Sequence, residues 1–186
     1  MIVSPADGRI IYVKSFDRDE PLVSLKFGRE IHLEEIGAGF FPTGVYLMGI
    51  RLSPLDVHVN RSPIDGKVRM VKHRPGRLVS LSPPGLLEES ERNSLIIENE
   101  AMTVAVIQMA AYLVRRTVVR VREGVQVRLG EKIGSIRLGS QVDLVIPREP
   151  GIRVRVGPGM SVKAGESVVA TFDPEPGFRA ARPEVA

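Results

Sequence analysis

Two short sequence patterns each occur twice in this chain, and they restrict its fold more than any other feature. Residues 4–10 are Ser-Pro-Ala-Asp-Gly-Arg-Ile, and residues 62–68 are Ser-Pro-Ile-Asp-Gly-Lys-Val. A Gly-x-x-Val-x-x-Gly-Glu pattern begins at Gly124 and again at Gly159. Each Pro-x-Asp-Gly predicts a tight turn that leads into a strand, with the glycine supplying a positive φ. Each second pattern predicts an inward-facing valine between two turn glycines.

The rest of the chain consists of short β-prone runs separated by Gly, Pro and charged residues. This pattern predicts a mostly β fold in a single domain, with few short helices. Paired turn–strand units of this kind resemble the barrel-sandwich architecture of lipoyl and biotinyl carrier domains. The carrier lysine is missing, because Met160 is followed by Ser161. A shared architecture would therefore not bring carrier chemistry with it.

Individual elements follow from local composition. Residues 24–37 are the best candidate for a short helix. Residues 101–114 are rich in alanine, but residues 103–107 are β-prone, and we predict a buried strand there. Further strands are expected at residues 131–137 and 142–146. The domain is expected to span residues 1–172, followed by a loose tail over 173–186 that contains three prolines.

Composition excludes several classes of protein. The absence of cysteine rules out disulfides, thiolate chemistry and zinc knuckles. A net charge of +4 suits nucleic acid or an anionic membrane, but no nucleic-acid motif is present. No dense cluster of ligating side chains predicts a metal site. The longest uncharged runs, residues 36–50 and 101–114, are shorter than the roughly 20 residues of a membrane-spanning helix.

The Leu-Gly-Ser sequence at residues 138–140 lies between two predicted strands. The Ser140 hydroxyl can attack the carbonyl carbon of Gly139 and move the acyl group from nitrogen to oxygen. β-Elimination and hydrolysis then leave a pyruvoyl group, a built-in electrophile that suits a chain without cysteine. Taken alone, a Gly-Ser dipeptide more often marks a plain turn.

Three motifs in order give this serine its meaning. They are Ser-Pro-Ala-Asp-Gly at 4–8, Leu-Ser-Pro-Leu-Asp-Val-His-Val-Asn-Arg-Ser-Pro at 52–63, and Leu-Gly-Ser at 138–140. Together they resemble the pyruvoyl-dependent phosphatidylserine decarboxylases, and most closely the short branch that includes the archaeal-type archaetidylserine enzymes. Residues 91–94 and 108–111 support the resemblance, which extends over roughly residues 2–172.

The resemblance implies self-cleavage between Gly139 and Ser140. The β chain would hold residues 1–139 and the α chain residues 140–186. The pyruvoyl group from Ser140 would bind the substrate amine as a Schiff base and accept the electrons released with CO₂. Gln141 stands where the longer branch has threonine, a difference we expect to be unimportant because the acyl shift needs only the two residues before it.

His58 and Asp7 complete the catalytic set that the resemblance implies. His58 would remove the proton from Ser140 and later protonate the product carbanion, since a neutral imidazole is a base near pH 7. Asp7 would orient His58, as in a Ser-His-Asp triad, with Asp56 in reserve. Without the resemblance, His58 would be an ordinary strand histidine and Asp7 a turn carboxylate. His32 and His73 are expected to be surface or turn residues.

Arg61 occupies the position of a second histidine in the longer branch, and it cannot act as a base. Either His58 performs both tasks or one of them falls to another group. Arg61 is a candidate to hold the substrate carboxylate or phosphate, and Asn60 is a second candidate for substrate binding. In a strand, Asp56, His58 and Asn60 would point to one side.

The expected substrate is phosphatidylserine or its archaeal ether-lipid equivalent, and the expected product is the ethanolamine lipid. The expected location is the cytoplasmic face of the cell membrane, reached peripherally or through an N-terminal segment that this chain lacks. An anionic membrane surface is an expected partner, and a homodimer is left open. Other functions left open are a non-catalytic barrel-sandwich binding module and a pyruvoyl enzyme for a soluble amino acid.

Two segments are candidates for membrane contact. The first is the basic run, more simply a solvated strand face, at Arg115, Arg116, Arg120, Arg122 and Arg128. The second is residues 37–49, where Phe40 and Phe41 would form a lipid-facing lip. A core strand with its turn is an equally good interpretation of the second segment.

Overall fold

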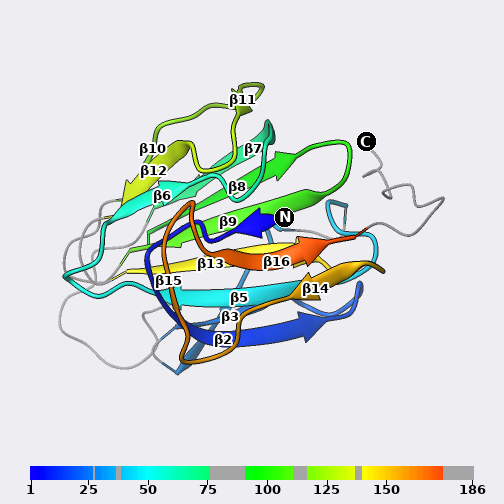
Figure 1. The fold of residues 1–186 in the computed structure, drawn as a ribbon, viewed down its shortest axis with the longest axis horizontal. Coiled ribbons are helices and arrows are strands. Elements are labelled where there is room, and N and C mark those ends of the chain that lie inside the picture. Colours follow the sequence, from blue (N-terminus) through cyan, green and yellow to red (C-terminus); the bar gives the residue numbers. More distant parts are fainter. Residues whose placement is uncertain (27, 37–38, 76–90, 111–116, 137–139, 174–186) are drawn as a thin grey trace.

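The protein is an all-β structure. The computed structural model describes residues 1–26, 28–36, 39–75, 91–110, 117–136 and 140–173, and within these ranges it contains sixteen strands and no helix. The mostly β prediction is therefore confirmed. Eight strands form one curled antiparallel sheet (Figure 1). In spatial order they are β11 (Gln126–Val127), β7 (Gly66–Arg74), β8 (Arg92–Glu98), β9 (Thr103–Met109), β13 (Gln141–Pro147), β5 (Val45–Arg51), β2 (Gly8–Phe16) and β15 (Ser161–Val162).

Three small sheets complete the fold. The first contains β1 (Ile2–Val3), β16 (Val168–Phe172) and β14 (Ile152–Val154), and the second contains β10 (Thr117–Val119), β12 (Lys132–Ile136) and β6 (Val59–Arg61). The third is the hairpin of β3 (Val23–Lys26) and β4 (Arg29–His32). The main hydrophobic core unites residues of the large sheet with those of the first two small sheets, and a second core unites its other face with β4 and the residues after it.

The repeated sequences form two structurally equivalent halves. β1, β2, β5 and β13–β16 make the first half, and β6–β12 make the second. The large sheet has the order β11-β7-β8-β9 from one edge and the matching order β15-β2-β5-β13 from the other. The two halves also exchange backbone hydrogen bonds, from Val3 N–H to the Pro63 carbonyl and from Arg61 N–H to the Pro5 carbonyl, both 3.0 Å.

The glycine of each Pro-x-Asp-Gly motif is required by close packing. A Cβ on Gly8 would lie 2.3 Å from the carbonyl oxygen of Arg51, and one on Gly66 would lie 2.5 Å from that of Glu98. The predicted positive φ is correct for Gly8 but wrong for Gly66. In both second patterns the glycines have positive φ and the valine is buried, as predicted.

Other local predictions have mixed outcomes. The buried strand within residues 101–114 is confirmed as β9, and those at 131–137 and 142–146 as β12 and β13. The short helix within residues 24–37 is wrong, because that segment contains β3 and β4. Phe41 is only 4% exposed and belongs to the core, so the lipid-facing lip is wrong for this residue. Residues 174–186, the greater part of the predicted tail, lie outside the described residues.

Candidate functional site

The candidate site lies where the chain crosses between the two halves. Residues 52–58 lead from β5 in the first half to β6 in the second, and the chain returns to the first half between β12, which ends at Ile136, and Ser140, which precedes β13. Leu52 N–H donates to the Ser140 carbonyl at 3.0 Å, and Ile136 N–H donates to the His58 carbonyl at 3.0 Å. The second and third motifs are therefore held side by side. In Figure 1 the loop 52–58, in cyan, protrudes at the left edge of the molecule.

The equivalent place in the second half is an ordinary turn. There Asn99 N–H donates to the Met102 carbonyl at 3.0 Å and closes the β8–β9 hairpin. The pair Glu98–Thr103 on β8 and β9 is equivalent to the pair Arg51–Gln141 on β5 and β13, so the Leu52–Ser140 hydrogen bond is equivalent to the one that closes the hairpin. In the first half there is no short turn at this place, because the whole second half is inserted between β5 and β13. Ser140 is consequently the first residue of the chain after the return crossover.

Ser140 is buried, with 2% of its surface exposed. It immediately precedes β13, which lies between β9 and β5 in the middle of the large sheet. Leu138 and Gly139, the other two residues of the third motif, lie outside the described residues. Of the two residues at the predicted cleavage point, the structure therefore describes the position of Ser140.

His58 has a defined tautomer. Its Nδ1 lies 2.7 Å from the carbonyl oxygen of Asp56. A carbonyl only accepts hydrogen bonds, so Nδ1 carries the proton in the neutral ring and Nε2 keeps its lone pair. Nε2 is buried and has no hydrogen-bond partner among the described residues. A buried nitrogen that can accept a proton and is not already occupied is what a general base requires.

Asp7 forms a turn contact in the structure. Its Oδ1 accepts a hydrogen bond from Ala164 N–H at 2.7 Å, and Asp65 in the second half accepts one from Leu129 N–H at 2.8 Å. No hydrogen bond joins Asp7 to His58 among the described residues. The Asp56 carboxylate accepts from Ser53 N–H at 2.6 Å, so Asp56 orients His58 through its backbone carbonyl.

Asn60 belongs to a buried chain of amides. Gln108 Nε2 donates to Asn60 Oδ1 at 2.7 Å, and Asn60 Nδ2 donates to the Pro5 carbonyl at 3.4 Å. Asn93 Nδ2 in turn donates to Gln108 Oε1 at 3.2 Å. This chain links the first and second motifs to the two supporting segments, and it occupies both ends of the Asn60 amide. Substrate binding by Asn60 stays a prediction that these contacts do not favour.

Arg61 points toward the glycine turns of both halves. Its guanidinium donates to the Gly130 carbonyl at 2.7 Å, and its Cδ would lie 2.8 Å from a Cβ placed on Gly165. These contacts give Arg61 a structural role at the junction of the halves. Its predicted role in holding a substrate anion stays a prediction.

A second polar cluster, beside Ser140, was not predicted from the sequence. Tyr12 Oη donates to Asp143 Oδ2 at 2.7 Å, and Gln141 Nε2 donates to Asp143 Oδ1 at 2.7 Å. Lys26 Nζ donates to the Met109 carbonyl at 3.2 Å and also to the Ala110 carbonyl. Asp143 is fully buried and Lys26 is 1% exposed. The available signal was a charged residue in the apolar run of residues 142–146.

Burial dominates the ionisation of this cluster. Desolvation raises the pKa of Asp143 from 3.8 to about 6, although hydrogen bonds and the charge of Lys26 oppose the rise. Desolvation lowers the pKa of Lys26 from 10.5 to about 8, opposed by the charge of Asp143. Burial and the nearby Asp143 also raise the pKa of Tyr12. Perturbed groups of this kind often accompany functional sites.

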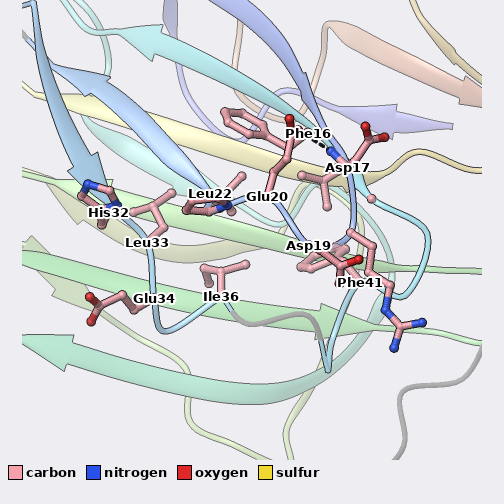
Figure 2. Close-up of a pocket in the computed structure, with 14 residues that line it drawn as sticks. Phe16, Asp17, Asp19, Glu20, Leu22, His32, Leu33, Glu34, Ile36 and Phe41 are labelled. Carbon is pink, nitrogen blue, oxygen red and sulfur yellow. Dashed lines mark hydrogen bonds between the residues drawn. The ribbon is translucent and has the colours of Figure 1, made fainter.

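A cavity lies at the opposite end of the large sheet. It has a volume of about 430 Å³. Phe16 and Val45 line it, and they form the pair at one end of the β2–β5 ladder, whereas Arg9 and Arg51 form the pair at the other end. Figure 2 shows apolar side chains such as Leu33 and Ile36 at this cavity, with acidic side chains nearby. None of the predicted site residues that the structure describes lines it. The cavity and the candidate site are therefore separate places.

Comparison with known proteins identifies the family. The family model described as phosphatidylserine decarboxylase matches residues 1–170. The chain is 40% identical over 91% of its length to a protein of Methanocaldococcus jannaschii, covering 80% of that protein. It is 40% identical over 94% of its length to one of Methanothermobacter thermautotrophicus, covering 74% of it. Both are named "Putative archaetidylserine decarboxylase proenzyme".

No solved structure matches the chain. Among the described residues, no helix is long and apolar enough to cross a membrane. The family match covers most of the chain, and both relatives are 40% identical to it over more than nine-tenths of its length. The resemblance found in the three motifs is therefore confirmed. The chain belongs to the phosphatidylserine decarboxylase family of carboxy-lyases.

Proposed function

We propose that this protein cleaves itself between Gly139 and Ser140 and then decarboxylates the serine headgroup of a phospholipid. The observation that carries the proposal is the pairing of the two crossovers between halves. It brings the His58 segment, whose Nε2 has no hydrogen-bond partner within the described part of the chain, beside the strand that leads to a buried Ser140. The names of the relatives favour archaetidylserine as the substrate, and phosphatidylserine is the diester alternative.

His58 acts as the base in the self-cleavage that we propose. Its Nε2 takes the proton as Ser140 Oγ attacks the Gly139 carbonyl carbon, and the departing peptide nitrogen is protonated, which leaves an ester. Loss of the Cα proton of residue 140 then breaks the Cβ–Oγ bond and releases the Gly139 carboxylate. Water hydrolyses the remaining enamine, through its imine tautomer, to ammonia and the pyruvoyl ketone.

The topology supports cleavage at this point. A break after Gly139 opens a crossover and interrupts none of the sixteen described strands. β13 would stay paired to β9 and β5, both of which belong to the other chain after cleavage. The α and β chains would therefore remain one folded unit, held by the central ladders of the large sheet.

The surroundings of residue 140 fit a pyruvoyl group. This group supplies a ketone that binds the substrate amine and accepts the electron pair released with CO₂. Leu52 N–H, which holds the Ser140 carbonyl at 3.0 Å, would fix its orientation. His58 would return a proton to the carbon that loses CO₂. Asp7 enters the proposal only through the family resemblance, which gives it the role of orienting His58; in the structure its carboxylate accepts a hydrogen bond from Ala164 N–H.

The lipid substrate leads us to propose action at a membrane surface. Exposed Arg120, Arg122 and Arg128 are the described members of the basic run, and their exposure agrees with a solvated face. Arg115 and Arg116 lie outside the described residues. A soluble amino acid as substrate remains the competing proposal, and the assay below separates the two.

Intact mass spectrometry tests the proposal. The wild-type protein should give two fragments divided at Gly139 and Ser140, with the α chain lighter by one NH₃ than simple hydrolysis would leave. Ser140→Ala should stay whole, and the rate of cleavage of His58→Gln should be lower than that of the wild type by about a hundred-fold or more. His32→Gln, a change at an exposed histidine, should cleave normally.

A wild-type chain that stays whole after long incubation would refute the self-cleavage. The substrate is tested by CO₂ release from the cleaved protein. Release from vesicles that contain phosphatidylserine, with none from free serine, is expected. Release from free serine alone would assign the protein to the soluble class.

A further inference from the structure

The loop beside the candidate site exposes large apolar side chains. Leu55 is 98% exposed and Val57 is 59% exposed, and both lie in the 52–58 crossover directly before His58. Leu55 is the most exposed large hydrophobic side chain among the described residues. The loop is stiffened at its base, where Asp56 bonds twice to Ser53. A stiff loop that presents apolar side chains to water suggests a partner for them.

Two arginines stand directly opposite each other at the base of this loop. Arg9 on β2 is paired with Arg51 on β5, both are exposed, and neither forms an ion pair with any described residue. Like charges that face each other across strands destabilise a sheet. The uncompensated pair therefore also suggests a partner, and one of negative charge.

The second half provides an internal comparison. The pair equivalent to Arg9 and Arg51 is Lys67 and Glu98, which carry opposite charges. The same position in the fold thus has complementary charges at the ordinary β8–β9 turn and two positive charges at the site. The fold therefore does not require two positive charges at this position, and the like-charge pair occurs only in the half whose pair lies beside the 52–58 loop.

We propose that the end of the molecule formed by the 52–58 loop, Arg9 and Arg51 docks on a lipid bilayer that contains anionic phospholipid. Leu55 and Val57 enter the acyl region, while Arg9 and Arg51 lie at the level of the phosphates. The inference rests on the proposed function, since it gives a lipid substrate a route to the site. His58 directly follows Val57 in the chain, so a headgroup would reach it without the lipid leaving the bilayer.

Flotation with vesicles tests docking without any chemistry. The probe is phosphatidylcholine vesicles with and without phosphatidylglycerol, an anionic lipid that carries no amine to decarboxylate. The wild-type protein should bind the anionic vesicles, and added salt should weaken the binding. Leu55→Ser should lower the partition coefficient about ten-fold or more, and Leu55→Phe should restore it. Arg9→Gln with Arg51→Gln should lower it by more than ten-fold.

The matched control is Lys67→Gln, which removes a positive charge at the equivalent place in the second half and should leave binding unchanged. Circular dichroism of each variant checks that it is folded. Equal binding by wild type and Leu55→Ser, or equal losses in the Lys67→Gln control, would overturn the proposal. Cleavage at Ser140 without vesicle binding would refute docking and leave the proposed function standing, and binding without cleavage would do the opposite.

Discussion

The buried pair Asp143 and Lys26 should give the protein an unusual dependence of stability on pH. Unfolded, Asp143 loses its proton near pH 3.8, whereas in the folded protein its pKa is raised to about 6. Between these values unfolding releases a proton, so the free energy of unfolding decreases as the pH rises. The stabilisation by the folded state's proton is complete below the lower value and lost above the upper one.

The magnitude follows from the two pKa values. Each pH unit across which one proton is released on unfolding changes the free energy of unfolding by about 1.4 kcal/mol. The rise from 3.8 to about 6 therefore gives a loss of about 3 kcal/mol for Asp143. Both oxygens of the carboxylate are fully buried and hydrogen-bonded within the protein, so solvent screening does not reduce this figure.

Lys26 has the opposite effect on how the free energy of unfolding depends on pH. Its pKa is lowered from 10.5 to about 8, so unfolding takes up a proton between these values and a rising pH increases stability. The contribution of this pair to stability should therefore be lowest between about pH 6 and pH 8. The expected regain above pH 8 is again about 3 kcal/mol.

Urea denaturation of Asp143→Asn against its parent measures the acidic limb. Both proteins carry Ser140→Ala, so that the chain stays whole and unfolding is reversible. Subtracting the two free energies at each pH cancels the titrations of groups that do not interact with Asp143, and the difference should change by about 2.4 kcal/mol between pH 4 and pH 7. Exposed Ser15→Ala, which removes no titratable group, is the control and should give a flat difference. A flat difference for Asp143→Asn as well would refute the reasoning.

Two further predictions concern stability alone, both measured by chemical denaturation. Glu35→Ala should lower the free energy of unfolding by about 3–5 kcal/mol, because it leaves buried Arg92 without the carboxylate that binds it at 2.8 and 2.9 Å; the exposed neighbour Glu34→Ala should cost almost nothing. Gly66→Ala should cost about 1–3 kcal/mol, because its Cβ would lie 2.5 Å from a carbonyl oxygen of β8. Gly157→Ala, where nothing lies within 4 Å, should be nearly neutral, and equal effects would contradict the packing argument.

Much of the fold could be predicted because its signals are local. Each turn pattern carries its own glycines and its own inward valine, so the two repeats and the strands beside them followed from short windows of sequence. The segment 24–37 was misjudged because β3 reverses the usual alternation. Ser24 and Lys26 point inward to polar partners while Val23 and Leu25 are only half-buried, and a pattern based on apolar burial does not detect such a strand.

The arrangement of the site could not be predicted in the same way. The Leu52–Ser140 hydrogen bond joins residues far apart in the sequence, and it exists because one half is inserted into the other. No local pattern indicates which repeat is interrupted. The motifs suggest His58 and Ser140 as partners only through the family resemblance. The structure shows that the segments around these two residues are paired, and the partnership itself stays a prediction.

Gln141 shows why the residue after the cleavage point matters even though the acyl shift does not need it. Cleavage would make residue 140 a chain end, and chain ends fray unless other contacts hold them. Gln141 is paired with both Met109 and Arg51. Its Nε2 also lies within hydrogen-bond distance of Asp143 Oδ1, the Leu25 carbonyl and Tyr12 Oη, at 2.7, 3.0 and 3.0 Å. We expected the replacement of threonine by Gln141 to be unimportant, but the Gln141 side chain connects the new terminus to the buried cluster. After cleavage, Gln141 would therefore hold the reactive group at residue 140 in position.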